Sequence, residues 1–129
     1  MTGFSAAVKL ACRTRAGNGD PYEARCEACG RWLGMTGGQV HHRQNRQMGG
    51  SRLRNTIMNA SLLCGNVYEL CHGAATRLSD RMKAMGFVLL STQDPAAESV
   101  MLHGQQSGVT VWLTPEGGYS AVSPAEAVA

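Results

Sequence analysis

Four cysteines in two sequence-close pairs constrain the fold of this chain more than any other feature. The first pair forms a C-x-x-C-G sequence, and the second pair encloses six residues. The four residues are Cys26, Cys29, Cys64 and Cys71. Four thiolates in this arrangement favour a closed tetrahedral zinc site, because deprotonated thiolates suit this borderline-soft ion. We therefore expect one structural zinc ion to hold two distant segments of the chain together.

Three histidines and one asparagine lie between the cysteine pairs or directly against the second pair. They are His41, His42, Asn59 and His72. Adjacent side chains on a strand point to opposite faces, so we expect His41 and His42 to have different tasks. His72 follows Cys71 at the start of a predicted helix, where an anionic phosphate is favoured. We interpret these groups as a second metal site that performs chemistry; surface histidines and a structural asparagine are the alternatives.

The composition describes one domain with a small core. The chain has 129 residues, of which 43% are hydrophobic and only 5% aromatic, and it contains sixteen glycines. A core of this kind benefits from a structural metal. No apolar run is long enough to span a membrane, and the N-terminus lacks the pattern of a secretion signal. We therefore expect a cytoplasmic protein, in which reduced thiols favour metal binding over disulfides.

Positive charge gathers in the middle of the chain. Between residues 28 and 68 there is no Asp or Glu. The arginines of the polar segment after the two histidines are Arg43, Arg46, Arg52 and Arg54. A local cationic field of this kind is typical of a protein that binds phosphate groups. We expect these four arginines to contact the phosphates of double-stranded DNA, and a solvated basic loop is the alternative.

The hydrophobic pattern predicts an α+β domain. We expect helices over 4–16 and 71–85, a strand over 39–42, a further strand over 87–91 and a hairpin formed by 99–103 and 109–114. The domain then divides into a helical lead-in, a zinc and histidine core, a β extension and a frayed tail, over 1–25, 26–86, 87–119 and 120–129. Cys12 lies in the apolar pattern of the first helix, which indicates a buried structural thiol. His103 borders the predicted turn, so we expect a surface histidine.

Three segments carry a resemblance to a known family. The chain contains HHRQNRQMGGSR, LLCGNVYELCHG and, more distantly, DPAAESVMLHGQQSGVTVWLTPEGGY. The order of C-x-x-C, His-His, an Asn five places before a Cys, and Cys-His at a helix start resembles the HNH endonuclease family. The likeness is to small HNH proteins of bacteriophages and their actinobacterial hosts. It covers residues 26–119, and its specific motifs lie before Gly73.

The resemblance implies a ββα-metal (His-Me) finger around one catalytic divalent ion. Carried over by position, His41 and His72 are ligands of that ion and His42 is the general base. Asn59, the central residue of the motif, orients the active-site loop or the base. Mg or Mn is the expected ion, and Ni or Zn are the alternatives. Some relatives place a further ligand one turn after the final His; here that position is Thr76, so water and substrate phosphate would complete the coordination.

The expected activity is hydrolysis of DNA phosphodiester bonds, by nicking or double-strand cleavage, with low sequence specificity. The family also implies a setting in phage genome processing inside the bacterial host, with a packaging terminase as a partner. Two alternatives use the same zinc site. One is a non-catalytic module that binds nucleic acid through the arginines, and the other is an interaction domain without DNA affinity. The His41, His42, Asn59 and His72 set favours the nuclease, because a binding module does not need it.

Overall fold

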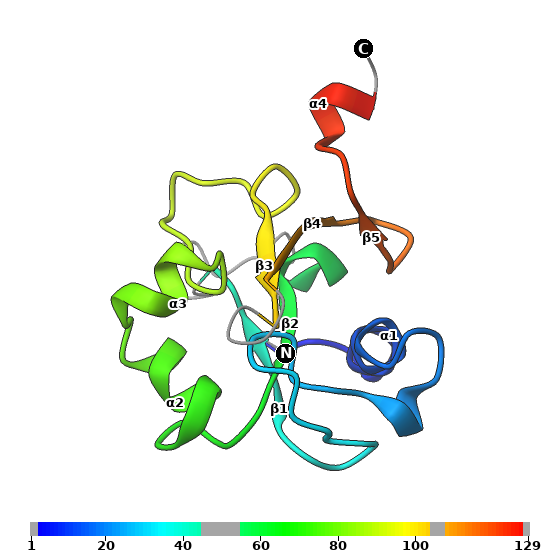
Figure 1. Cartoon of the computed structure of the whole chain (residues 1–129), viewed down its shortest axis with the longest axis vertical. Helices are drawn as coiled ribbons and strands as arrows, with labels where there is room; N and C mark the ends of the chain where they lie inside the picture. Colours follow the sequence, from blue (N-terminus) through cyan, green and yellow to red (C-terminus); the bar gives the residue numbers. More distant parts are fainter. Residues whose placement is uncertain (1–2, 45–54, 104–107, 128–129) are drawn as a thin grey trace.

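The described residues fold into an α+β arrangement of two small antiparallel sheets with short helices beside them (Figure 1). The computed structural model describes residues 3–44, 55–103 and 108–127. Its helices are α1 (Ala6–Ala16), α2 (Leu70–Thr76), α3 (Asp80–Ala84) and α4 (Pro124–Ala127), with 3-10 turns η1 (Pro21–Glu23) and η3 (Ile57–Asn59). Its strands are β1 (Gln39–His42), β2 (Ala60–Leu63), β3 (Val100–Leu102), β4 (Val109–Leu113) and β5 (Tyr119–Ser120).

Helix α1 begins and ends where local signals place it. The Ser5 side chain accepts a hydrogen bond from the Val8 amide at 3.1 Å, which caps the first turn. The helix gives way to a turn at Gly17, so the predicted range of 4–16 is close to the observed one. Phe4 and Cys12 are buried. The predicted apolar face of this helix therefore packs into the core.

The first sheet consists of β1 and β2 in antiparallel register, with His41 opposite Ser61 and His42 opposite Ala60. All four residues of β2 are buried. In Figure 1 this sheet lies between α1 on one side and the α2–α3 segment on the other. Coverage on both sides explains why β2 lacks the polar alternation of a half-exposed strand.

The single helix predicted over 71–85 is wrong, since two helices occupy that range. Leu78 adopts a left-handed φ of 58°, which interrupts the helical path. Ser79 then accepts a hydrogen bond from the Met82 amide at 3.2 Å and starts α3. Gly86, with φ of 86°, ends α3 in the conformation expected of a C-terminal glycine. The helical spacing of hydrophobic residues continues from α2 into α3, so the sequence pattern gave no sign of the break between them.

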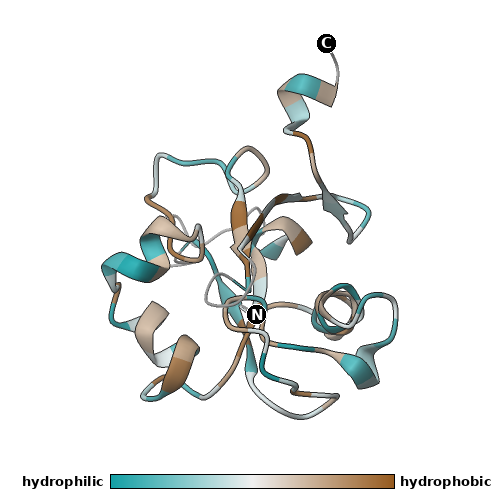
Figure 2. Cartoon of the chain, in the orientation of Figure 1, coloured by the Kyte–Doolittle hydropathy of each residue, from teal (hydrophilic) through white to brown (hydrophobic). Residues whose placement is uncertain are grey.

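The second sheet has the strand order β3-β4-β5 and contains the predicted hairpin, with Val100 opposite Val111. Two neighbouring predictions are wrong. Residues 87–91 form no strand, and only Leu89 makes an isolated bridge, to Gln44. The tail, expected to fray, instead forms the end of β5 and helix α4. Figure 2 shows hydrophobic residues in α2 and β3 and hydrophilic ones in α3.

A buried polar network joins α1 to the sheets. Arg15 and Glu27 form an ion pair of 2.9 Å, and both side chains are almost completely buried. Glu27 also accepts hydrogen bonds from the Leu62 amide and from the Tyr119 hydroxyl. The network thus connects α1, the first cysteine pair, β2 and β5. Among the described residues, no helix is long and apolar enough to cross a membrane.

Candidate metal centre and histidine pocket

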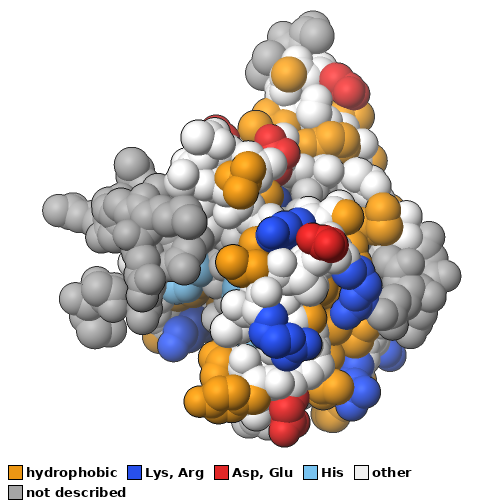
Figure 3. Space-filling view, turned by 90° about the vertical axis from the view of Figure 1, so that its left-hand side faces the viewer, with side chains coloured by type: hydrophobic (Ala, Val, Ile, Leu, Met, Phe, Trp, Pro, Cys, Tyr) orange, Lys and Arg blue, Asp and Glu red, His pale blue; other side chains and the backbone are white. Residues whose placement is uncertain are grey.

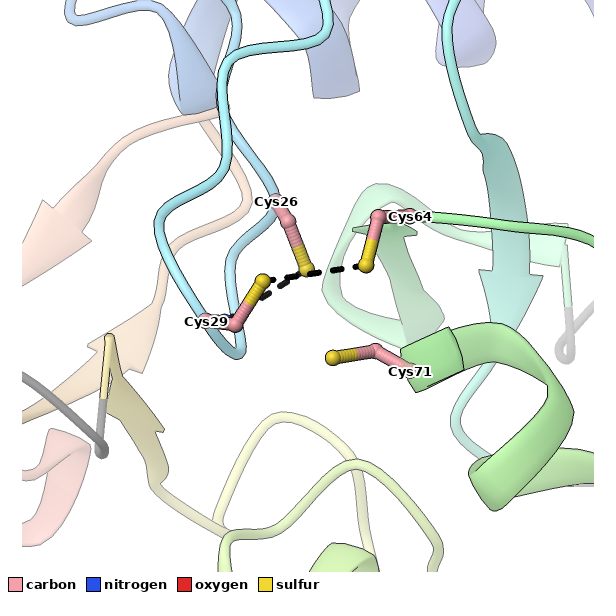
Figure 4. A group of neighbouring side chains, drawn as sticks. All are labelled: Cys26, Cys29, Cys64 and Cys71. Carbon is pink, nitrogen blue, oxygen red and sulfur yellow. Dashed lines mark hydrogen bonds between the residues drawn. The ribbon is translucent and has the colours of Figure 1, made fainter. Parts of the chain in front are cut away.

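The four paired cysteines converge on one point. Figure 4 shows their sulfurs facing a common centre, from the loop before β1, the end of β2 and the start of α2. All four Sγ atoms lie within 4.8 Å of one another, and those of Cys29 and Cys64 are 3.7 Å apart. A tetrahedral zinc ion with bonds of about 2.3 Å holds its sulfurs about 3.8 Å apart. The cluster therefore has the size needed to hold a metal ion such as zinc.

Local backbone structure brings each cysteine pair together. In the first pair, the Gly30 amide bonds to the Cys26 carbonyl at 2.8 Å, and Gly30 has a left-handed φ of 85°. The Glu27 amide bonds to the Leu62 carbonyl at 2.8 Å and fastens this turn to β2. In the second pair, the His72 amide bonds to the Cys64 carbonyl at 2.9 Å. The six residues between the second pair therefore fold back as a small closed loop.

Two thiols of this cluster, those of Cys26 and Cys64, have raised pKa values. A hydrogen bond with Cys71, followed by burial, raises the pKa of the Cys26 thiol. Burial raises the pKa of Cys64 to about 11. A negative thiolate beside three other sulfurs is unfavourable without a compensating charge, and a divalent cation supplies that charge. The donor set and its burial therefore fit a soft divalent metal.

The three histidines of the central segment meet at a second location, a surface pocket of about 210 Å³ between β1 and α2. The pocket is lined by Val40, His41, His42, His72, Ala75, Thr76 and Leu78. The ring centroids of His41 and His72 are 5.3 Å apart. Two imidazoles that share one ion at about 2.1 Å place their centroids roughly 5 Å apart. The spacing of this pair fits a shared metal ion.

His41 is held in one orientation by the chain after α3. Its Nε2 lies 3.1 Å from the Phe87 carbonyl oxygen, and donation there leaves Nδ1 unprotonated as a ligand atom. Burial, followed by repulsion from His72, lowers the pKa of His41 to about 4. Burial also lowers the pKa of His72. Both imidazoles are therefore neutral near pH 7, the form that binds metals.

His72 carries a buried nitrogen that lacks a hydrogen-bond partner among the described residues. The side chain is 8% exposed, and the buried atom is Nδ1. Buried polar atoms are normally satisfied, and a bound cation is one way to satisfy a ring nitrogen. Thr76, one turn later, uses its hydroxyl to bond the His72 carbonyl at 2.9 Å. The described lining of the pocket contains no carboxylate.

His42 has a different set of contacts from His41, as strand alternation predicts, although both line the pocket. Its Nε2 lies 2.9 Å from Asn55 Oδ1. Its ring stacks on Phe4 with centroids 3.8 Å apart and an angle of 13° between the planes. Sequence reasoning missed both partners, because neither residue belongs to a motif or lies near His42 along the chain.

Asn59 secures the backbone that leaves β1. Its side chain is completely buried. Asn59 Oδ1 accepts from the Gln44 amide at 2.7 Å, and Nδ2 donates to the Gln44 carbonyl at 3.1 Å. The Arg43 amide also bonds to the Asn59 carbonyl at 2.8 Å. Asn59 thereby fixes the path of the chain directly after His42.

Arg43 does not face solvent, so its prediction as a DNA contact is wrong. The side chain is 1% exposed. The guanidinium donates hydrogen bonds of 2.9 Å to four backbone carbonyls, those of Met58, Gly86, Pro95 and Glu98. Burial lowers its pKa to about 10. Arg43 therefore stabilises the fold by joining these backbone segments. The other predicted DNA contacts, Arg46, Arg52 and Arg54, lie outside the described residues.

Two further sequence predictions concern a cysteine and a histidine outside these sites. Cys12 is completely buried, and burial raises its pKa to about 12, which confirms a structural thiol. His103 is only half-buried, and its amide bonds to the Glu27 carbonyl at 2.9 Å. Neither residue lines the cysteine cluster or the histidine pocket.

The pocket opens on a face that carries basic side chains. Figure 3 shows histidine at the surface of the face formed by α2 and α3, with Lys and Arg side chains on the same face. In this segment Arg77, Arg81 and Lys83 are exposed, and Asp80 is an exposed acid. The described surface beside the pocket is therefore suited to an anionic partner.

Comparisons with known proteins add no assignment. No protein-family model matches the sequence, no curated protein is significantly similar to it, and no solved structure matches it. The chemistry of the two sites therefore rests on their own geometry.

Proposed function

We propose that this protein is a metal-dependent HNH endonuclease that hydrolyses phosphodiester bonds of DNA. One observation carries the proposal: His41 and His42 from β1 and His72 from α2 line a single surface pocket. Asn59 supports this arrangement, because it holds the backbone directly after His42. A protein that only binds nucleic acid has no need of three histidines gathered in this way.

The order of elements supports a ββα-metal finger. Strands β1 and β2 form an antiparallel pair, and α2 follows in the chain. The cysteine cluster ties the loop before β1 to the start of α2. In this proposal a zinc ion in the cluster fixes the position of α2, and with it the distance between His72 and β1.

His41 and His72 would hold the catalytic ion, and Mg or Mn are the proposed ions. A divalent cation bound there stabilises the charge that develops on the phosphate in the transition state. His41 contributes Nδ1, because its Nε2 faces the Phe87 carbonyl. Thr76 lines the pocket without offering a charged ligand. We therefore expect weak affinity for the ion in the absence of DNA.

His42 is the proposed general base. It lies next to His41 in β1 and lines the same pocket, so a water bound beside the ion is within its reach. It would take a proton from a water in the pocket as the water oxygen attacks the phosphorus; the P–O3′ bond would break, and the departing 3′ oxygen would take a proton from solvent. Asn59 maintains the backbone geometry that this transfer requires.

Double-stranded DNA is the proposed substrate, bound through its backbone phosphates. Exposed Arg77, which lies between the pocket residues Thr76 and Leu78 in sequence, supports this choice, and Arg46, Arg52 and Arg54 stay predicted contacts. Contacts of this kind predict low sequence specificity. The family resemblance adds a phage packaging terminase as a proposed partner, in the cytoplasm of a bacterial host.

A plasmid-nicking assay tests the proposal. With zinc-loaded protein and added Mg or Mn, we expect supercoiled DNA to become nicked or linear. His42→Ala should reduce the rate by about 10²–10⁴-fold, the usual contribution of a general base. His103→Ala is the matched control, because His103 lies outside the pocket, and it should keep full activity.

Two results would contradict this account. Unchanged activity in His42→Ala would remove His42 from the base role. DNA binding without cleavage in any of Mg, Mn, Ni or Zn would favour the non-catalytic zinc module.

A further inference from the structure

The imidazole of His42 is held from two sides by residues that lie far from it in sequence. Asn55 Oδ1 is 2.9 Å from His42 Nε2, a normal hydrogen-bond distance for a ring N–H. The Phe4 ring covers one face of the imidazole at a centroid distance of 3.8 Å and 13° from parallel. A hydrogen bond at a ring nitrogen and a stacked face restrict different motions of the same ring.

The contact with Asn55 selects one tautomer of the neutral imidazole. An amide oxygen only accepts hydrogen bonds, so it pairs with His42 when Nε2 carries the proton. The other nitrogen, Nδ1, is then unprotonated and can receive a proton. With the Asn55 amide oriented so that Oδ1 faces the ring, the opposite tautomer would place two lone pairs against each other at 2.9 Å, and only a half-turn of the amide would relieve them.

Each partner lies close in sequence to a residue that is anchored by hydrogen bonds. Phe4 is 4% exposed, and the next residue, Ser5, caps α1. Asn55 leads directly into η3, whose Asn59 makes two hydrogen bonds with the Gln44 backbone. The position of the His42 ring is therefore set by the N-terminal segment and by the chain that enters β2.

We propose that Asn55 and Phe4 are positioning residues, which hold His42 as the Nε2–H tautomer with its ring plane fixed in the pocket. The assignment of this ring as a base rests on the proposed nuclease function, whereas the held tautomer does not. Asn55 acts through the hydrogen bond and Phe4 acts through stacking. Neither contacts the reacting atoms.

Nitrogen-15 NMR of the imidazole in zinc-loaded protein without a second metal tests the held tautomer directly. We expect His42 to show the Nε2–H pattern in the unaltered protein and in Asn55→Asp, since a carboxylate also accepts from Nε2. In Asn55→Ala the pattern should shift toward a mixture of tautomers. Asn18→Gly serves as control, because Asn18 is exposed and lies away from the pocket.

Nicking kinetics test the consequence for the reaction. Asn55→Ala should lower kcat by about tenfold or more and leave KM nearly unchanged, and Asn55→Asp should restore most of the loss. Phe4→Leu should lower kcat in the same way, whereas Phe4→Tyr, which keeps a stacking ring, should not. Thermal unfolding of each variant separates a loss of fold from a loss of positioning.

The outcomes distinguish the two proposals. The same tautomer and the same kcat in folded Asn55→Ala would overturn the positioning role. Suppose instead that the unaltered protein shows the Nε2–H tautomer, that Asn55→Ala loses it, and that the protein cleaves no DNA. This result would support the positioning role of Asn55 and overturn the nuclease function.

Discussion

At the scale of single residues, the environment of His41 decides what that side chain can do. It lies among buried groups, with His72 as its ring neighbour, and the described lining of the pocket offers no acid to balance a charge. Protonation is therefore costly, and the pKa falls to about 4. A neutral imidazole with one nitrogen bonded to the Phe87 carbonyl is preorganised as a metal ligand.

This environment predicts a pH response of the metal-free pocket. In NMR titration of zinc-loaded protein without a second ion, His41 should stay neutral above pH 5 and take a proton only near pH 4. The unfolded residue takes its proton near pH 6.5. Between pH 6.5 and pH 4 the unfolded state therefore binds a proton that the folded state does not bind. The stability of the fold should fall as the pH is lowered from 6.5 to 4. A midpoint near 6.5 in the folded protein would contradict the assigned burial.

Residue identity alone revealed part of the site. The paired spacing of the cysteines predicted their meeting, and the structure places all four sulfurs together. The motif positions of His41, His42 and His72 predicted a shared location, which the pocket shows. The partners Phe4 and Asn55 could not be predicted, because their contacts depend on how α1 and η3 pack against β1. Arg43 was misjudged for the same reason: charge indicates a surface residue unless the fold supplies enough acceptors.

At the scale of elements, the chain after α3 is attached to the end of β1 mainly by side-chain hydrogen bonds, including those of buried Arg43, and not by strand pairing. Residues 87–91 were predicted to form a strand, but they lie beside the end of β1 through one bridge and through hydrogen bonds from side chains. His41 bonds to the Phe87 carbonyl and Arg43 to the Gly86 carbonyl. Hydrophobic periodicity contains no information about such side-chain to backbone ties. The same limit concealed the break between α2 and α3, which depends on the Ser79 cap.

Replacement of Arg43 should therefore destabilise the fold. Arg43→Met keeps an unbranched stem but removes the guanidinium donors of four buried or partly buried carbonyls, so we expect a loss of about 3 kcal/mol or more in the free energy of unfolding. Arg77→Met, on the exposed end of α2, is the matched control and should change stability by about 0.5 kcal/mol or less. Urea unfolding measures both; equal stability of the two variants would show that Arg43 is not a structural tie.

At the scale of the whole molecule, polar groups and the cysteine cluster join distant parts of the fold in addition to the apolar core. The Arg15–Glu27 pair links α1, β2 and β5, and the cysteine cluster links the first loop to α2. The low aromatic content of 5% is consistent with this construction. Composition and cysteine spacing predicted the need for a metal, but the buried ion pair could not be located without the packing of α1.

We propose that this chain binds two different cations, one among sulfurs and one between imidazoles. Anomalous diffraction from crystals of the zinc-loaded protein, soaked in excess Mn²⁺, tests it most directly. The account predicts a zinc peak amid the four Sγ atoms and a manganese peak about 2 Å from a ring nitrogen of both His41 and His72. His72→Ala should keep the first peak and lose the second. Zinc density without any manganese between the two histidines in the unaltered protein would contradict the account.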